Sequence, residues 1–351
     1  MAGKKSKVFV ALSGGVDSST AAALLIRQGF DCQGVFMATS EQAGHAQADA
    51  EKMADCLGIK LHVLDMREEF KKVLSYFGDE YARGRTPNPC VFCNRYIKFG
   101  RLWQFAKDNG ADFFATGHYA KIVNHGGGCG LYETKNKTKD QSYVLSMIDK
   151  NVLPHIILPL ADLLKEQTKE LAKEFGLHIE GRKESQEICF IPNDDYIAAI
   201  EQYCPALART GNIIDSSGKV LGSHNGIHRF TIGQRRGLNV AMGVPYYVTK
   251  IDAVNNTVTL GPKEEVMHRK FRALGLNWLV DEPMAAFGAK VKIRYNSPGQ
   301  TAAVQTDGDA AIVEFDKPVS AITPGQLAAF YIEDNFGWRA VASAWIDSVI
   351  G

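Results

Sequence analysis

The sequence predicts an α/β amino-terminal domain built on a parallel sheet, followed by two small β-rich domains, the last of them a β-barrel. Two observations predict this architecture. Strand-like apolar runs alternate with helical periodicity over residues 1–120, which is typical of repeated βα units. Beyond about residue 208, short strand-like runs are separated by turn residues such as Asn225-Gly226 and Gly261-Pro262. We place the three domains at residues 1–195, 196–263 and 264–351.

The spacing of apolar residues places the individual elements in order. Strands are expected at residues 8–12, 31–37, 59–64 and 112–116, and helices at 16–28, 42–57, 70–77, 94–109 and 162–175. Glycines follow several of these helices, as C-terminal caps do. Residues 124–130 are expected to form a hairpin tip, and Ile191-Pro192-Asn193 a domain edge. The carboxyl-terminal strands are expected at 290–295, 301–305, 311–315, 327–332 and 340–344.

Ligands of parallel sheets bind at the carboxyl ends of the strands. This rule places three segments at one rim: Ser13–Ser18 after the first strand, Met37 at the end of the second, and Thr116–His118 after a later one. At the first of them, Ser13-Gly14-Gly15 leads directly into a helix. Glycines let the backbone approach an anion, and a helix N-terminus favours negative charge, so the sequence predicts a phosphate site. An ordinary tight turn is the alternative.

Bulk composition excludes several classes of protein. The chain has 351 residues, a net charge of +1 and 45% hydrophobic residues, as ordinary soluble proteins do. Nucleic acid would have to bind through local basic patches, because there is no overall basic charge. No apolar run is long enough to span a membrane, and the first strand begins too early for a signal peptide, so we expect a cytoplasmic protein without membrane contact. Seven cysteines make a disulfide framework unexpected.

Three cysteines are candidates for chemistry. Cys90 and Cys93 follow the rigid segment Thr86-Pro87-Asn88-Pro89 and precede a helix, and Cys189 lies at the end of the α/β domain. A helix N-terminus and the neighbouring Arg95 and Lys98 lower a thiol pKa. A single Cys-x-x-Cys pair is compatible with structural zinc, a redox dithiol or an iron–sulfur ligand set, although structural zinc normally needs a second pair. Buried cysteines without a chemical role are expected at Cys32, Cys56 and Cys204.

Motifs spread over nearly the whole chain resemble those of one family. They are Ser-Gly-Gly-Val-Asp-Ser (13–18), Asn-Pro-x-x-x-Cys-Asn-x-x-Ile-Lys-Phe (88–99), Ala-Thr-Gly-His-Tyr (115–119), Lys-Asp-Gln-Ser-Tyr (139–143), Glu-Ser-Gln-x-Ile-Cys-Phe-Ile (184–191), Phe-Thr-Ile-Gly-Gln-Arg-Arg-Gly-Leu (230–238), Lys-Ile-Arg-Tyr (292–295) and Pro-Gly-Gln (324–326). The first resembles the pyrophosphate (PP) loop of enzymes that cleave ATP between its α and β phosphates. Together, in this order, the motifs resemble the tRNA-specific 2-thiouridylases, which place sulfur at C2 of the wobble uridine (U34) of tRNA.

The resemblance implies a Rossmann-like PP-loop fold of the adenine nucleotide alpha hydrolase type, with ATP and Mg²⁺ as cofactors. Uridine O2 would be adenylated, and a persulfide sulfur would then replace the adenylate, giving 2-thiouridine, AMP and pyrophosphate. Cys93 would be the catalytic nucleophile and Cys189 the persulfide carrier. A cysteine desulfurase or a sulfur carrier protein would be the donor, and the two cysteines would end as a disulfide.

The resemblance also assigns binding residues. The expected ATP site comprises Ala11, Leu12, Ser13, Gly14, Gly15, Val16, Asp17, Ser18, Met37 and Gly117. The expected contacts to the target base and tRNA are Asn88, Pro89, Cys90, His118, Lys139, Asp140, Gln141, Arg294, Tyr295 and Gln326. The Lys-rich residues 134–141 would by themselves be interpreted as a solvated loop, and the resemblance makes them a tRNA contact.

Two alternatives stay open. Many family members carry Asp where this chain has Cys90, so Cys90, Cys93 and Cys189 would form a three-thiolate set for a [4Fe–4S] cluster that carries the sulfide. The chain would then transfer sulfur through the cluster instead of a persulfide. A different class of function is a non-catalytic RNA-binding or iron–sulfur carrier protein that keeps an ATP fold. Amidotransferase-linked synthetases share the loop, but nothing carboxyl-terminal here resembles a glutaminase.

Overall fold

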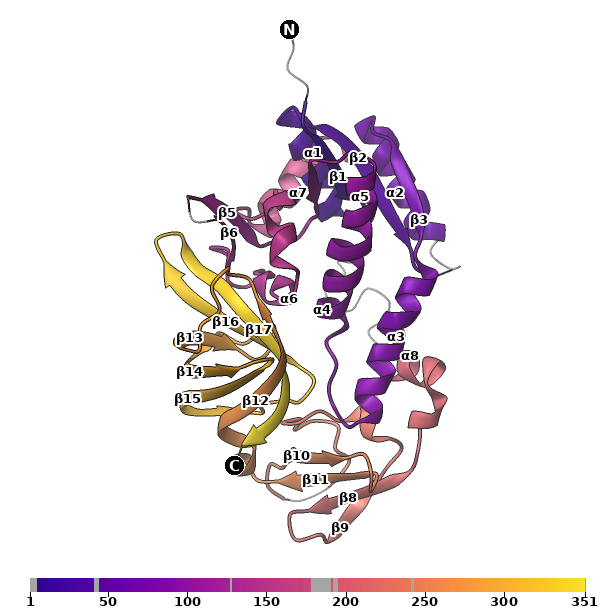
Figure 1. The fold of residues 1–351 in the computed structure, drawn as a ribbon. Coiled ribbons are helices and arrows are strands. Elements are labelled where there is room, and N and C mark those ends of the chain that lie inside the picture. The colour runs from indigo at the N-terminus through magenta and orange to yellow at the C-terminus, as the bar shows by residue number, and fades with distance from the viewer. Residues whose placement is uncertain are drawn as a thin grey trace.

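The computed structural model describes residues 5–40, 44–126, 128–177, 191, 195–240 and 243–350. In this part of the chain the strands form three sheets, of five, four and eight strands. Figure 1 shows the α/β layer at the amino-terminal end of the molecule, with the two β-rich parts at the other end. This arrangement confirms the predicted fold class. The domain boundaries placed from the sequence stay predictions.

The five-stranded sheet is parallel throughout. It consists of β1 (Lys7–Ala11), β2 (Asp31–Ala38), β3 (Leu61–Asp65), β4 (Phe113–Ala115) and β7 (Ile156–Ile157), in the order β3-β2-β1-β4-β7. The chain runs from β1 towards β3 on one side and returns to place β4 on the other. The topological switch point therefore lies between β1 and β4, where such sheets bind their ligands.

Helices cover both faces of this sheet. Val8 and Val10 of β1 pack in one cluster with side chains of α1 (Val16–Arg27), α2 (Gly44–Leu57) and α7 (Lys165–Glu174). Phe9 points to the other face, towards α3 (Arg67–Ala82) and the helix that follows the Cys-x-x-Cys pair. Successive strand residues alternate between faces, which is why a strand buried on both sides is apolar at every position.

The cysteine-bearing helix begins earlier than the sequence predicted. α4 (Pro89–Cys93) continues through a π-helical segment η2 (Asn94–Leu102) into α5 (Trp103–Asp108). The Asn88 side chain caps α4 by accepting from the Val91 N–H, and proline is favoured at the first helical position because it has no N–H to satisfy. The predicted start at Asn94 was therefore wrong by one and a half turns, and Cys90 and Cys93 lie inside the helix.

A hairpin from the α/β half joins the last sheet. β5 (Lys121–His125) and β6 (Gly128–Tyr132) extend the barrel sheet through pairing of β6 with β17. Two short helices follow, α6 (Ser142–Leu145) and η3 (Lys150–His155). The hairpin that the sequence predicted at residues 124–130 is present, but nothing in the sequence indicated its partner.

The central sheet has four strands, β8 (Gly211–Asp215), β9 (Val220–His224), β10 (Tyr247–Asp252) and β11 (Thr257–Gly261), in the order β10-β11-β8-β9. It is preceded by α8 (Tyr196–Tyr203), which packs against α3 through Ala199 and Ile200. This helix was missed from the sequence. Three short 3₁₀ turns, η5 (Pro205–Leu207), η6 (Ile227–Arg229) and η7 (Lys263–Val266), complete this region.

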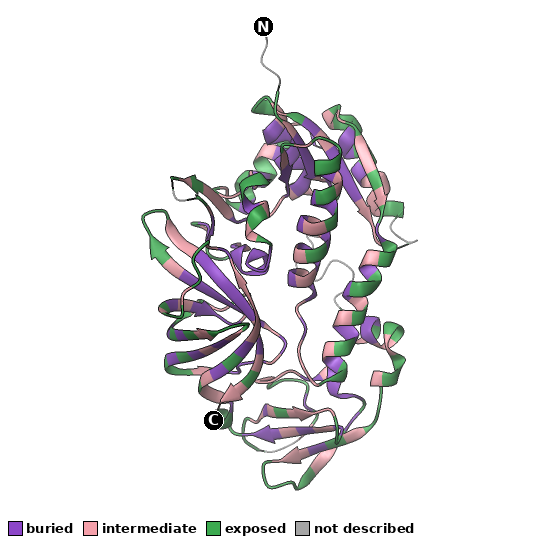
Figure 2. Cartoon of the chain, in the orientation of Figure 1, coloured by how far each residue is buried: buried purple, intermediate pink, exposed green. Residues whose placement is uncertain are grey.

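The last six strands close into an antiparallel barrel. They are β12 (Met267–Trp278), β13 (Ala286–Lys292), β14 (Gln300–Asp307), β15 (Ala310–Ser320), β16 (Leu327–Asp334) and β17 (Gly337–Ile350), and β12 pairs with both β15 and β17. The strand predicted at residues 290–295 ends at Lys292, so Arg294 and Tyr295 follow it. Figure 2 shows the buried residues concentrated on the sheets and on the helix faces that cover them.

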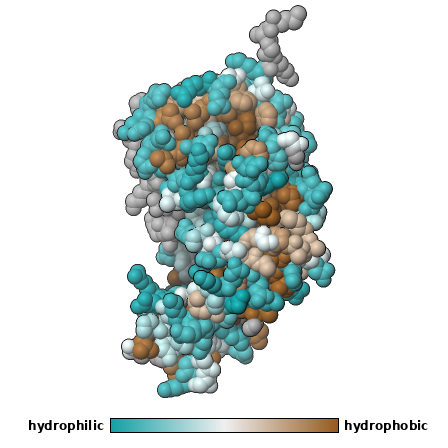
Figure 3. All heavy atoms as spheres, turned by 90° about the vertical axis from the view of Figure 1, so that its left-hand side faces the viewer, coloured by the Kyte–Doolittle hydropathy of each residue, from teal (hydrophilic) through white to brown (hydrophobic). Residues whose placement is uncertain are grey.

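On the face seen in Figure 3, apolar residues form separate patches within a largely hydrophilic surface. Among the described residues, no helix combines the length and apolar character needed to cross a membrane.

Candidate active site

The loop after β1 leaves the first turn of α1 open. Gly15 is the N-cap residue and offers no side chain to the free N–H groups of the helix. The Ser18 hydroxyl donates to the Gly15 carbonyl at 3.2 Å and accepts from the Ser13 N–H at 3.1 Å. These bonds hold the loop in shape while the helix N–H groups stay available to an anion, as in phosphate-binding loops.

Two glycines allow this loop to pack closely against its neighbours. Gly14 has φ +74°, and a Cβ there would lie 2.7 Å from the Ala50 nitrogen of α2. A Cβ on Gly117 would lie 2.8 Å from the Asp17 carbonyl carbon, so the loop after β4 rests on the start of α1. Ala11 pairs with Val35, which places Met37 level with Ser13 on the adjacent strand. The loops after β1 and β4 therefore meet at the switch point, and Met37 lies at the same edge of the sheet on the other side of β1.

The Asp17 carboxylate is held by residues that the sequence reasoning missed. Lys165 Nζ donates to both carboxylate oxygens, at 2.6 and 2.7 Å, and the Tyr119 hydroxyl donates to one of them at 2.8 Å. A Mg²⁺ ion at this carboxylate would share it with Lys165, and the free lone pairs of a carboxylate allow that. Two signals in the sequence could have found them: Tyr119 belongs to the 115–119 motif, and Lys165 lies in the first turn of the helix predicted at 162–175.

His118 lies on the same rim. Burial, with a smaller contribution from the nearby Lys98 charge, holds its pKa well below the ordinary value of 6.5. Its Nδ1 is 2.7 Å from the Thr116 hydroxyl. Its ring lies 6.0 Å from that of Phe99, which belongs to η2. His118 thus connects the phosphate-loop rim to the helix that carries the cysteines.

Cys90 and Cys93 lie one turn apart on α4. Cys93 is 6% exposed and packs in the main core, whereas Cys90 is half-buried. Cys189 lies outside the described residues, as does the rest of its motif at 184–190. Within the described ranges, no three histidine, cysteine or acidic side chains form a group that would hold a metal ion. The described residues thus contribute two of the three thiols that the cluster prediction requires.

Two residues predicted to contact tRNA, Arg294 and Gln326, make hydrogen bonds within the protein, and their contact with tRNA stays a prediction. Gln326 Nε2 donates to the carbonyls of Thr86 and Pro87, at 3.1 and 3.0 Å, and so supports the loop that leads to Asn88. Arg294 donates to the Ala321 carbonyl at 2.6 Å and the Thr323 hydroxyl at 2.9 Å. Gln326 thus supports the loop before the cysteine helix, whereas Arg294 holds the segment that contains Ala321 and Thr323.

Tyr295 lies near the cysteine helix. It is half-buried, and its pKa is raised by burial and by the nearby Asp140 and Cys90. Asn88 and Pro89 open the cysteine helix on the same side, with the Asn88 N–H bonded to the Tyr76 hydroxyl at 3.2 Å. The fold therefore brings together predicted base-contact residues from three separate parts of the chain.

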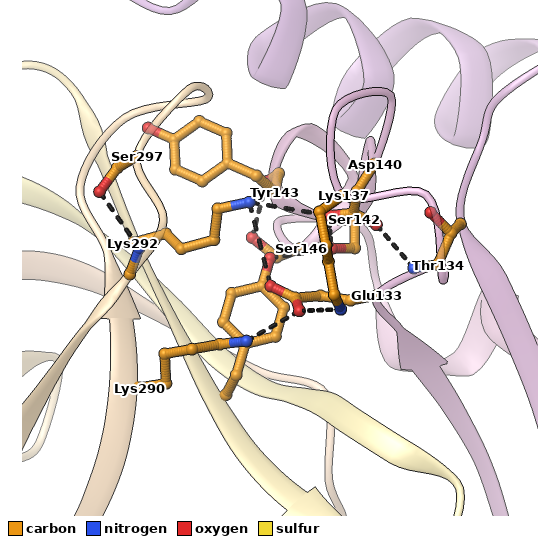
Figure 4. A network of polar contacts seen from close by, with 12 residues as sticks. Glu133, Thr134, Lys137, Asp140, Ser142, Tyr143, Ser146, Lys290, Lys292 and Ser297 are labelled. Carbon is orange, nitrogen blue, oxygen red and sulfur yellow. Dashed lines mark hydrogen bonds and ion pairs between the residues drawn. The ribbon is translucent and has the colours of Figure 1, made fainter.

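The segment after β6, residues 133–141, is held by a buried ion network that joins the α/β half to the barrel (Figure 4). Glu133 accepts from Lys137 at 2.7 Å and from Lys290 of β13 at 2.8 Å, and Lys292 lies 3.7 Å from Asp140. Burial raises the pKa of Asp140, although the bonds from Ser142 and Thr134 oppose this. The network fixes the segment from which a tRNA contact was predicted.

The three predicted contacts of this segment differ in their surroundings. Asp140 is buried, whereas Lys139 is half-buried. The Gln141 side chain accepts from the Tyr119 N–H at 2.8 Å, next to His118. Gln141 therefore links the segment to the phosphate-loop rim.

One open pocket lies away from this rim. It measures about 780 Å³ and is lined by the carboxyl-terminal end of α1, by α7, and by β5 and β7. The phosphate loop precedes α1, so the pocket is at the opposite end of that helix. None of the candidate site residues lines this pocket, so we do not assign it to the active site.

Comparisons with known proteins identify the family. The tRNA methyl transferase HUP domain matches residues 6–193, the tRNA methyl transferase PRC-barrel domain 198–262 and the aminomethyltransferase beta-barrel domain 268–336. The tRNA-specific 2-thiouridylase MnmA of Carboxydothermus hydrogenoformans is 44% identical over 94% of this chain and 96% of its own. Among solved structures, a 4-thiouridine synthetase–RNA complex with bound ATP has a TM-score of 0.38 and 19% identity, over 57% of this chain and 50% of that one.

The tRNA-specific 2-thiouridylase MnmA of Syntrophotalea carbinolica is 44% identical over 98% of this chain and 99% of its own. The match thus includes the phosphate loop, the cysteine helix and the barrel together, as the motifs had indicated. The chain belongs to the tRNA-specific 2-thiouridylase family.

Proposed function

We propose that this protein catalyses the ATP-dependent 2-thiolation of the wobble uridine of tRNA. The observation that carries the proposal is that the phosphate-loop rim lies next to the helix that bears Cys93. The phosphate loop lies at the switch point of the parallel sheet, and His118 on its rim contacts Phe99 of the helix that bears Cys93. An ATP-cleaving site beside a cysteine site is what activation of an oxygen followed by its replacement with sulfur requires.

In the first step, uridine O2 attacks the α-phosphorus of ATP and pyrophosphate leaves, which turns the O2 oxygen into part of a good leaving group. The N–H groups at the start of α1 stabilise the phosphate charge. Mg²⁺, held in part by Asp17, would neutralise charge on the phosphates. Burial lowers the pKa of His118, which favours a ring that offers a hydrogen bond on this rim over one that adds positive charge.

In the second step, the terminal sulfur of a Cys189 persulfide attacks C2, the C2–O2 bond breaks and AMP leaves. Cys93 then attacks the Cys189 sulfur, which releases 2-thiouridine and forms a Cys93–Cys189 disulfide. A cysteine desulfurase or a sulfur carrier supplies the persulfide, and a thiol reductant resets the disulfide. This route uses two cysteines, whereas the cluster alternative needs Cys90 as a third ligand.

The test measures 2-thiouridine by nucleoside mass spectrometry and pyrophosphate release, with tRNA, ATP and a persulfide donor, in the absence of thiol reductant. Cys93→Ala and Cys189→Ala are expected to release pyrophosphate without forming free 2-thiouridine. Cys129→Ala is the matched control, since burial raises the pKa of that thiol and it lies on the hairpin.

Three outcomes would count against the proposal. Normal thiolation by Cys93→Ala would remove the assigned nucleophile. Activity that rises with iron content in anaerobically purified protein, and falls in Cys90→Asp, would favour the cluster route. No pyrophosphate release with any tRNA would indicate a non-catalytic binding protein.

A further inference from the structure

Four aromatic rings from different parts of the chain form a continuous column beside the cysteine helix. Trp345 of β17 lies 5.8 Å from Tyr76 of α3, measured between ring centroids. Tyr76 stacks on Phe92 of α4 at 4.6 Å with an interplanar angle of 15°. Phe92 lies 4.5 Å from Tyr96 of η2. Tyr96 is the outer member of this aromatic column and is 49% exposed.

Two rings of the column lie on the same helix as Cys93. Phe92 and Tyr96 flank Cys93 on the same helix, with Tyr96 one turn beyond it. The Tyr76 hydroxyl accepts from the Asn88 N–H, at the start of the same helix. The exposed end of the column therefore lies within one helical turn of the proposed nucleophile.

Arg95 places a positive charge next to the exposed Tyr96 ring. The Arg95 guanidinium carbon lies 5.4 Å from the Tyr96 ring centroid, and Lys98 is close enough to His118 to lower its pKa. Within the described residues, neither cation forms an ion pair with an acidic side chain, and the Arg95 guanidinium donates to the Met147 sulfur at 3.5 Å. An exposed aromatic ring with an adjacent guanidinium is the combination on which proteins stack unpaired bases of RNA.

The burial of Cys93 supplies the reason for such a contact. Because this thiol is 6% exposed, a uridine that reaches it must leave its place in the anticodon loop. The base next to it then loses a stacking partner, which is unfavourable. A ring that accepts the neighbouring base offsets part of this cost and holds the loop open.

We propose that Tyr96, supported by Arg95, stacks on the base adjacent to the target uridine and extends the aromatic column by one ring. The inference rests on the proposed function, because it takes the anticodon loop of tRNA as the substrate. It makes Tyr96 a positioning residue: the ring orients the RNA and takes no part in bond making or breaking.

The test uses anticodon stem-loops with 2-aminopurine either directly 5′ or directly 3′ of the wobble uridine. Stacking on an aromatic ring quenches the fluorescence of this base. Wild-type protein is expected to quench one of the two RNAs, Tyr96→Phe to retain that quenching, and Tyr96→Ala to lose it with a roughly ten-fold weaker RNA affinity. ATP affinity is expected to be unchanged. Tyr203→Ala is the control, since Tyr203 is 48% exposed and lies on α8.

The outcomes separate the two proposals. If tRNA is thiolated but neither RNA is quenched, or Tyr96→Ala binds RNA as the wild type does, the stacking assignment is overturned and the proposed function stands. If wild-type protein neither binds nor thiolates tRNA, the proposed function fails and the stacking assignment fails with it. Circular dichroism of the Tyr96 variants confirms that they are folded, as expected for a change at a half-exposed ring.

Discussion

At the scale of single residues, the phosphate site depends on a carboxylate that distant residues orient. Asp17 and Lys165 are separated by 148 positions in the sequence, yet their side chains form a close ion pair. Tyr119 adds a hydroxyl that bridges Asp17 and Thr168, at 2.8 and 3.0 Å. Hydrogen bonds to a charged group are among the stronger ones, so this arrangement restricts the orientation of Asp17.

Tyr119→Phe tests this orientation. The ring stays in the core, while the bonds to Asp17 and Thr168 are lost. We expect a roughly five-fold higher KM for ATP, equivalent to about 1 kcal/mol, with the KM for tRNA unchanged. Both constants follow from pyrophosphate release.

Tyr132→Phe is the matched control for this variant. Its hydroxyl also donates to an aspartate at 2.8 Å, Asp334, but on the hairpin side of the barrel. An equal rise in KM for ATP in both variants would show that the effect is general and that Tyr119 does not orient Asp17.

At the scale of elements, the turn between β1 and α1 requires glycine for two different reasons. Gly14 adopts a left-handed conformation and faces the α2 backbone, where a Cβ would meet Ala50 at 2.7 Å. Gly15 has φ −84°, which any residue adopts, and a Cβ there would meet only the Ser13 hydroxyl at 3.5 Å. The fold therefore needs glycine at position 14. At position 15, glycine is expected to serve the approach of an anion.

Gly14→Ala and Gly15→Ala separate these reasons. Gly14→Ala is expected to lower the free energy of unfolding by at least about 1–2 kcal/mol, because the left-handed conformation alone costs that much with a side chain. Gly15→Ala should unfold like the wild type in urea, yet bind ATP more weakly. Similar unfolding midpoints for the two variants would contradict this account.

At the scale of the whole molecule, the barrel is held against the α/β half by strand pairing and by the buried network around Glu133. The hairpin β5–β6 extends the barrel sheet, and the Gln326 side chain supports the loop before the cysteine helix. Burial alone would raise the pKa of Glu133, but the bonds from Lys137 and Lys290 outweigh it and lower the pKa below 4.5.

Glu133→Gln is expected to cost roughly 3 kcal/mol of stability near neutral pH, because it leaves Lys290 without its carboxylate partner and removes one of the two carboxylates near the buried Lys292. A carboxylate with a lowered pKa stabilises the fold above its unfolded pKa, near 4.5, and this contribution is lost as the pH falls through the lower folded value. The stability difference between wild type and variant should therefore shrink below pH 4.5.

Urea unfolding measured from pH 8 down to pH 3 checks this dependence, because the loss is expected only below pH 4.5. Lys137→Met is the control, since the Lys137 side chain is 59% exposed and its loss should cost no more than about 1 kcal/mol. A difference between wild type and Glu133→Gln that is constant with pH would contradict an ionic role for Glu133.

The sequence by itself determined the local chemistry and the class of fold. A glycine turn between a strand and a helix, two cysteines at a helix start, and alternating βα periodicity all depend on neighbours within a few residues, and each was predicted. The helix α8 and the early start at Pro89 were missed because packing on α3 and the Asn88 cap outweighed the periodic pattern.

Only the tertiary structure decided which distant residues meet. The pairing of Lys165 with Asp17, the contact of Gln326 with the loop before Asn88, and the aromatic column that ends at Tyr96 each join separate elements. It also showed that Arg294 and Gln326 bond within the protein. The physical reason is that periodicity reports which face of an element is buried, whereas contact partners depend on how the whole sheet, helix layer and barrel pack together.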